Sequence, residues 1–140
     1  MIYRYNNTQK IGKVAGGGNL TDSGWVDIEW TSNFKDYADL PNNGAQVRRI
    51  GNIVYLRGVA APTQTLPTSS AQIMSTLPKG FRPDKNVYAI MQGSGSRRWQ
   101  LIVAPTGGVG CGRYGTDSFE DIDTGVWLPF NVSYVAGDNQ

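Results

Sequence analysis

The chain has 140 residues, of which 39 % are apolar, 11 % aromatic and 17 % charged, and its formal net charge is +2. This length suits a single domain with one core, and the composition is too apolar for a disordered chain. The small net charge gives no reason to expect nucleic acid as a partner, and no apolar run is long enough to span a membrane. The absence of histidine excludes a Ser-His-Asp triad, a Cys-His pair and the commonest zinc sites.

Residues 1–21 differ in character from the rest of the chain. A short apolar stretch is followed by polar residues and then by Gly16-Gly17-Gly18, which is the chemistry of a flexible linker. We expect an N-terminal arm or linker here, either mobile or paired with a neighbouring subunit, and one β-rich head domain over residues 22–140.

The first expected strand is Trp25–Trp30. Alternation turns three of its residues towards a core: Val26, Ile28 and Trp30. Trp25 then lies on the other face, where it needs cover from the arm or from another subunit unless a bulge switches its face. Residues 31–45 are expected to form a long polar loop.

Two β-rich runs, residues 46–50 and 53–60, flank Gly51-Asn52. Gly and Asn tolerate the positive φ of tight hairpin turns, so the pattern predicts a hairpin. Ile53 to Leu56 are consecutive apolar residues, and we expect this strand to be covered on both faces. Arg57 shares a face with Tyr55, where its charge needs a partner.

Further strands are expected at residues 72–77, 86–92, 97–104, 109–114 and 126–135. Frequent glycines and prolines separate them, and no segment has a sustained helical period. About eight strands with regular turn signals predict an all-β fold, either an antiparallel β-sandwich or a β-barrel. The single cysteine, Cys111, excludes an internal disulfide and is expected to be a small buried strand residue.

Three phrases follow one another in this sequence: Asp22 to Trp25 (DSGW), Val47 to Gly58 (VRRIGNIVYLRG) and Leu77 to Pro83 (LPKGFRP). Together they resemble the C-terminal head of tail-fibre and baseplate receptor-binding proteins from phages of Gram-positive bacteria. The resemblance covers residues 22–136. Val47 departs from it, because the family often has an aromatic residue at that position.

The resemblance implies a β-sandwich or β-barrel head that forms a homotrimer and binds host cell-surface polysaccharide without catalysis. It implies a protein made in the bacterial cytoplasm and carried in the virion at the tail tip or baseplate, beside other tail or baseplate proteins. It implies no cofactor and no membrane insertion, and it carries over no binding residues. The alternatives are a structural tail or baseplate module without a ligand and, less favoured, a glycan-degrading enzyme, for which an isolated carboxylate pair is lacking.

A saccharide site combines an aromatic face with planar hydrogen-bonding groups, and an anionic wall polymer adds a demand for arginine. The first candidate site meets these demands and comprises Arg97, Arg98, Trp99, Tyr114 and Asp117. The opposing interpretation is that Trp99 belongs to the core, since alternation groups it with Leu101 and Val103, and that the arginines form a solvated edge.

The second candidate site lies around the long loop and comprises Trp30, Asn33, Phe34 and Tyr37. Its aromatic content is high for a loop, but the rings can instead pack onto the sheet or a neighbouring subunit.

The acidic run has oxygen ligands that suit Ca²⁺: Asp117, Glu120, Asp121 and Asp123. Its spacing is not that of an EF-hand, so we expect a solvated loop and no metal site. Three arginines that lie within the shared phrases are expected to be structural: Arg49, Arg57 and Arg82. Their expected partners are the carboxylates of Asp27, Glu29 or Asp84.

Overall fold

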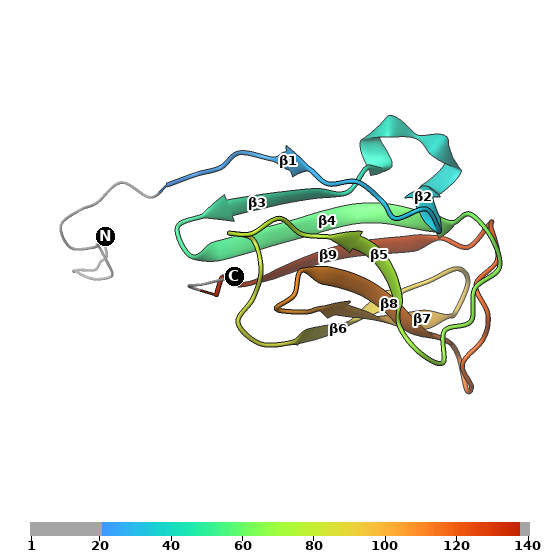
Figure 1. The fold of residues 1–140 in the computed structure, drawn as a ribbon. Coiled ribbons are helices and arrows are strands. Elements are labelled where there is room, and N and C mark those ends of the chain that lie inside the picture. The colour runs from blue at the N-terminus through green and yellow to red at the C-terminus, as the bar shows by residue number, and fades with distance from the viewer. Residues whose placement is uncertain (1–20, 138–140) are drawn as a thin grey trace.

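The computed structural model describes residues 21–137, and within them nine strands form two antiparallel sheets (Figure 1). The sheets face each other as the two layers of a sandwich, which confirms the expected all-β fold. One strand more than expected is present. The arm expected over residues 1–21 lies, apart from Thr21, outside the described residues.

The first sheet has five strands: β1 (Val26–Asp27), β2 (Phe34–Asp36), β3 (Gln46–Ile50), β4 (Ile53–Pro62) and β9 (Leu128–Val135). The long strand β4 is its centre and pairs with β2, β3 and β9, while β1 pairs with β3. Two short 3-10 turns, η2 (Tyr37–Asp39) and η3 (Pro41–Asn43), join β2 to β3.

The second sheet has four strands in the order β5-β8-β7-β6. Their bounds are Gln72–Thr76 for β5, Val87–Gln92 for β6, Arg98–Val103 for β7 and Gly108–Gly115 for β8. These strands lie close to the expected positions. Burial alternates along β6 and β7, whereas β5 and β8 do not alternate regularly and were located by their apolar residues and the turn signals around them.

The β3–β4 hairpin turns at Gly51-Asn52 as predicted, with Ile50 opposite Ile53 and Gly51 at a φ of 60°. The expectation that β4 is covered on both faces is wrong. Exposure alternates in its first half: Ile53 and Tyr55 are 36 % and 38 % exposed, whereas Val54 and Leu56 are buried. Only the last three residues of the strand are buried in succession. The outward face of this part of the five-stranded sheet has no second layer over it within residues 21–137.

The region before the hairpin also differs from the prediction. The first strand is only two residues long, and Trp30 makes a single bridge to Ser75 on β5. The expected loop of residues 31–45 contains β2 and the two 3-10 turns. Its polar sequence hides this strand, which exists because β4 extends far enough to pair with it.

The core fills the space between the two sheets and includes the buried Cys111. At its centre, Trp30 and Trp99 pack edge-on against Phe130, with ring centroids 6.1 and 6.3 Å away. Phe130 lies over Gly58, where an added Cβ would fall 2.7 Å from the ring. Burying such large apolar side chains is the main favourable contribution to folding.

Arg49 and Arg82 act through backbone carbonyl groups, not through the expected carboxylates. Arg49 donates to the carbonyl oxygens of Gly51 and Gly80, each at 2.8 Å, and Arg82 donates to Leu77 O at 2.8 Å. Arg49 therefore ties the hairpin turn to the segment of residues 77–83. The second and third phrases that resemble phage heads are thus in direct contact in the structure.

Candidate functional site

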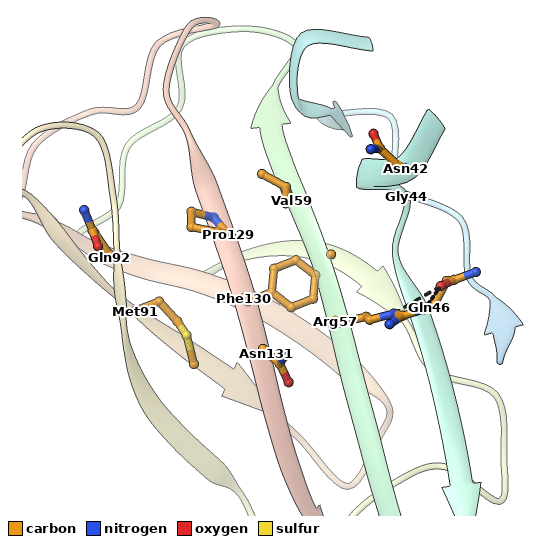
Figure 2. Close-up of a pocket in the computed structure, with 11 residues that line it drawn as sticks. Asn42, Gly44, Gln46, Arg57, Val59, Met91, Gln92, Pro129, Phe130 and Asn131 are labelled. Atoms are coloured by element: carbon orange, nitrogen blue, oxygen red, sulfur yellow. Dashed lines mark hydrogen bonds between the residues drawn. The ribbon is translucent and has the colours of Figure 1, made fainter. Parts of the chain in front are cut away.

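A shallow hollow of about 520 Å³ lies on the outward side of the five-stranded sheet (Figure 2). We call it the sheet-face hollow. Strands β3, β4 and β9 form it together with η3 and the end of β6. Its polar lining residues are Asn42, Gln46, Arg57, Gln92 and Asn131.

The strand register brings the central groups of this hollow together. Gln46 on β3 lies opposite Arg57 on β4, and Arg57 lies opposite Asn131 on β9. Residues directly opposite one another in antiparallel strands point to the same face, so these three side chains form one row. The residues on either side of Arg57 in the chain point the other way, as Leu56 does into the core.

Arg57 is held in place before any ligand arrives. Its Nε and Nη2 donate to Gln46 Oε1 at 3.2 and 2.8 Å, and Gln46 Nε2 donates to Asp27 Oδ1 at 2.8 Å. Its Cζ lies 3.6 Å from the ring centroid of Trp25, a cation–π contact. The remaining nitrogen, Nη1, makes no hydrogen bond with another described residue. Arg57 therefore offers a donor in a fixed orientation, which lowers the entropy lost on binding.

Three amide side chains around Arg57 make no hydrogen bond with the rest of residues 21–137: Asn42, Gln92 and Asn131. Figure 2 shows Gln92 on one side of β9 and the Arg57–Gln46 pair on the other. Each amide offers two N–H donors and a carbonyl acceptor. The lining residues described here include no carboxyl group. The hollow can therefore bind a hydroxyl-bearing ligand through its amide and guanidinium groups.

An ion pair lies beside the hollow on the same face. Arg48 Nη2 approaches Asp22 Oδ2 to 2.6 Å. The hydrogen bonds from Arg48 and from the Gly24 N–H lower the pKa of Asp22 to about 2. The charge of Arg48 is therefore paired with that of Asp22, whereas Arg57 has no carboxylate partner in the described part of the chain. The expected pairing of Arg57 with a carboxylate is thus replaced by an amide and an indole ring.

This site was not predicted from the sequence, although two of the features that form it were. Alternation placed Trp25 on the outward face, and it placed Arg57 on the same face without an obvious partner. An outward aromatic residue and an outward arginine two strands apart become neighbours only through the register. That register requires Val26 to pair with Val47, which the sequence alone does not specify.

The residues of the first candidate site do not form a single exposed site in the structure. Trp99 and Tyr114 are 1 % and 2 % exposed and belong to the core, so neither ring presents a face to a ligand. Trp99 Nε1 also donates to Gln92 O at 2.9 Å. The alternation of Trp99 with Leu101 and Val103 explains this position, as the opposing interpretation held.

The remaining members of that candidate are separated. Arg97 forms an ion pair with Glu120, with Nε 2.8 Å from Oε1. Arg98 is exposed and lines a second hollow with Arg113 and Phe119, whereas Asp117 is exposed but not part of that lining.

The second candidate site does not form one exposed surface. Phe34 is buried, and Trp30 is half-buried with its Nε1 donating to Asp36 Oδ1 at 2.6 Å. Both line an acidic hollow of about 660 Å³, which neither Asn33 nor Tyr37 lines. The aromatic residues Trp30 and Phe34 therefore pack onto the sheet, as the alternative interpretation held.

Within residues 21–137, no group of three or more His, Cys, Asp or Glu side chains is arranged to hold a metal ion. Over the same residues, no helix has the length and hydropathy needed to cross a bilayer. The chain matches no known family model, and no curated protein matches it significantly.

Proposed function

We propose that this protein is a receptor-binding head of a phage tail fibre or baseplate, which binds a saccharide of the host cell wall without catalysis. One observation carries the proposal: the sheet-face hollow combines a pre-positioned Arg57 with three amides that make no side-chain hydrogen bond within residues 21–137. The three sequence phrases that resemble phage heads give the proposal its biological setting.

The chemistry of the hollow suits a sugar chain. Sugar hydroxyl groups both donate and accept hydrogen bonds, as do Asn42, Gln92 and Asn131. Apolar side chains between them, Val59, Met91 and Pro129, can contact the C–H faces of a sugar ring. Glycoside hydrolysis needs two opposed carboxyl groups, which the described lining lacks, so the proposal is for reversible binding.

A shallow site of this kind binds a single sugar weakly. Adhesion becomes strong when several copies act together, as in a homotrimer repeated around a tail tip. We therefore include self-association and assembly with other tail or baseplate proteins in the proposal. The virion is the proposed location of the mature protein, after synthesis in the bacterial cytoplasm.

The test uses fluorescently labelled protein and a panel of whole Gram-positive cells. At least one strain should be decorated, and removal of its wall polysaccharide should abolish the signal. Arg57→Ala should reduce decoration about tenfold, because a charge-assisted hydrogen bond is lost. Lys79→Ala removes the same charge from an exposed site outside the hollow and should leave binding unchanged. Release of reducing sugars from the walls would contradict the non-catalytic proposal.

A purely structural tail or baseplate module is the second candidate function. Exposed apolar residues favour it, because Ile53, Tyr55 and Val135 form a strip on the same outward face. Such a strip suits a subunit interface. An assembled trimer in light scattering, with no decoration of any cell in the panel, would favour this alternative. A clean monomer would count against both forms of the phage proposal.

A further inference from the structure

A second hollow, of about 300 Å³, lies beside the four-stranded sheet. We call it the arginine hollow. Its lining comes from β6 and β7 and from β8 and the turn that follows it, and includes Ile90, Arg98, Gln100, Arg113, Thr116 and Phe119. It shares no lining residue with the sheet-face hollow.

A β-bulge turns Arg113 into the arginine hollow. Arg98 pairs with Gly115 and Gln100 pairs with Gly112, so β8 has two residues, Arg113 and Tyr114, opposite one residue of β7. Strict alternation from Gly112 would point Arg113 into the core and Tyr114 outwards. The extra residue reverses this arrangement, since Tyr114 is buried and Arg113 is exposed. Bulges often re-aim side chains in this way next to functional sites.

The bulge holds Arg113 in an unfavourable backbone conformation, with a φ of 54°. Left-handed φ values are uncommon for residues other than Gly, Asn and Asp. Where such strain persists, the surrounding structure enforces it, and strained residues cluster at binding and catalytic sites. The left-handed φ of Arg113 is therefore part of the same bulge, which the surrounding structure must hold in place.

Buried hydrogen bonds enforce this conformation. Thr68 is almost fully buried; its hydroxyl donates to Glu120 O at 2.6 Å and accepts from Tyr114 N at 3.0 Å. Arg113 N donates to Thr68 O at 2.7 Å. The arginine hollow is therefore built on a rigid backbone.

Among the described residues, the two arginines of this hollow have no carboxylate partner. Neither Arg98 nor Arg113 forms an ion pair or a side-chain hydrogen bond with another residue of the described chain. The carboxylate of Glu120 is already occupied by Arg97. Arg113 Cζ lies 5.6 Å from the ring centroid of Phe119, which is itself more than half exposed. Two free guanidinium groups beside an open aromatic ring favour a ligand that is both anionic and partly apolar.

We propose that the arginine hollow binds a sugar unit that carries a phosphate or a carboxylate. Arg98 and Arg113 would hold the oxyanion, since guanidinium groups match the geometry of both anions. The Phe119 ring would cover a C–H face of the sugar, and Gln100 and Thr116 would bind its hydroxyl groups. This site is separate from the sheet-face hollow and does not depend on the function proposed for it.

The test is a calorimetric titration of the full chain at low salt with four probes: glucose 6-phosphate, glucuronic acid, glucose and inorganic phosphate. At least one anionic sugar should bind more tightly than glucose or inorganic phosphate, and added salt should weaken this binding. The comparison of the two anionic sugars identifies the preferred oxyanion. Equal binding of glucose would overturn the role of the arginines. Equal binding of inorganic phosphate would overturn the assignment to a sugar, and no binding of either anionic sugar would overturn the proposal.

Two variants separate binding from folding. Arg113→Gly suits the left-handed φ, so its Tm should equal or exceed that of the wild type while the affinity for the anionic sugar falls about tenfold. Arg98→Ala should lower the affinity for the anionic sugar by a similar factor. Lys85→Ala removes an exposed cation elsewhere and should bind normally. An equal loss in Lys85→Ala, or a lowered Tm with retained binding in Arg113→Gly, would contradict the proposal.

Discussion

The two hollows position their arginines in different ways. Arg57 occupies a regular position on β4, where strand alternation alone points it outwards. Arg113 occupies a bulge with a left-handed φ, and buried hydrogen bonds from Thr68 fix the backbone around it. A regular strand orients a side chain without backbone strain, whereas a bulge stores strain of about 1 kcal/mol or more. The sheet-face hollow should therefore tolerate substitution, and the arginine hollow should depend on its supporting residues.

The largest effect is expected at the base of the arginine hollow. Trp99→Ala should destabilise the protein by about 4 kcal/mol, because it leaves a cavity beside Phe130 in the core. Trp25→Ala, on the sheet face, should cost about 1 kcal/mol or less, since it loses mainly a cation–π contact. Urea unfolding measures both. A stable Trp99→Ala variant that had lost cell binding would instead make Trp99 a ligand-stacking residue.

A smaller effect is expected at the turn that closes the arginine hollow. Gly115 has a φ of 147°, and an added Cβ would fall 2.1 Å from Ser118 O, so Gly115→Ala forces the loop to move. We expect a loss of about 3 kcal/mol in the free energy of unfolding. Gly125→Ala is the matched control, because a Cβ there meets nothing within 4 Å. Similar stabilities for the two variants would show that the turn is not strained.

The next largest loss of stability is expected when the buried hydroxyl of Thr68 is removed. Thr68→Val keeps the shape but leaves Glu120 O and Tyr114 N without their partner, which should cost about 2 kcal/mol. Asn131→Ala on the sheet face breaks no hydrogen bond with described residues and should change stability by less than about 0.5 kcal/mol. Denaturant titration compares them. Equal losses of stability in the two variants would show that the arginine hollow depends on its supporting residues no more than the sheet-face hollow does.

The smallest effect concerns Cys111, which lies in the regular part of β8 just before the bulge. Burial raises the pKa of its thiol to about 12, so the folded protein keeps the proton at a pH where the unfolded chain loses it. Stability should therefore fall as pH rises above the unfolded pKa, by about 1 kcal/mol near pH 9.5 relative to Cys111→Ala. Unfolding titrations of both proteins across this range measure the difference. Rapid alkylation of the native thiol at neutral pH would contradict this burial.

Most strands of the sandwich were predictable from the sequence, whereas the sheet-face hollow was not, because it depends on the register of β1 against β3. Apolar and period-two patterns located most strands, and the Gly-Asn pair located the turn. Alternation also supported the opposing interpretation that Trp99 points inwards, although Trp99 was placed in the first candidate site. The bulge was not predictable, because nothing local in Arg113-Tyr114 shows that an extra residue is inserted opposite Trp99. Thr68 was also missed, since it lies 46 residues away from Tyr114 in the chain. Contacts of this kind depend on how the whole sandwich packs.

The central claim is that the outward face of the five-stranded sheet binds a wall saccharide. The most direct test is an NMR titration with polysaccharide fragments released from the walls of a Gram-positive strain that the labelled protein decorates. Binding should shift the side-chain signals of Arg57, Gln92 and Asn131, and Arg57→Ala should weaken the titration. Saturable binding that leaves these three signals unchanged would contradict the claim and move the site elsewhere on the molecule.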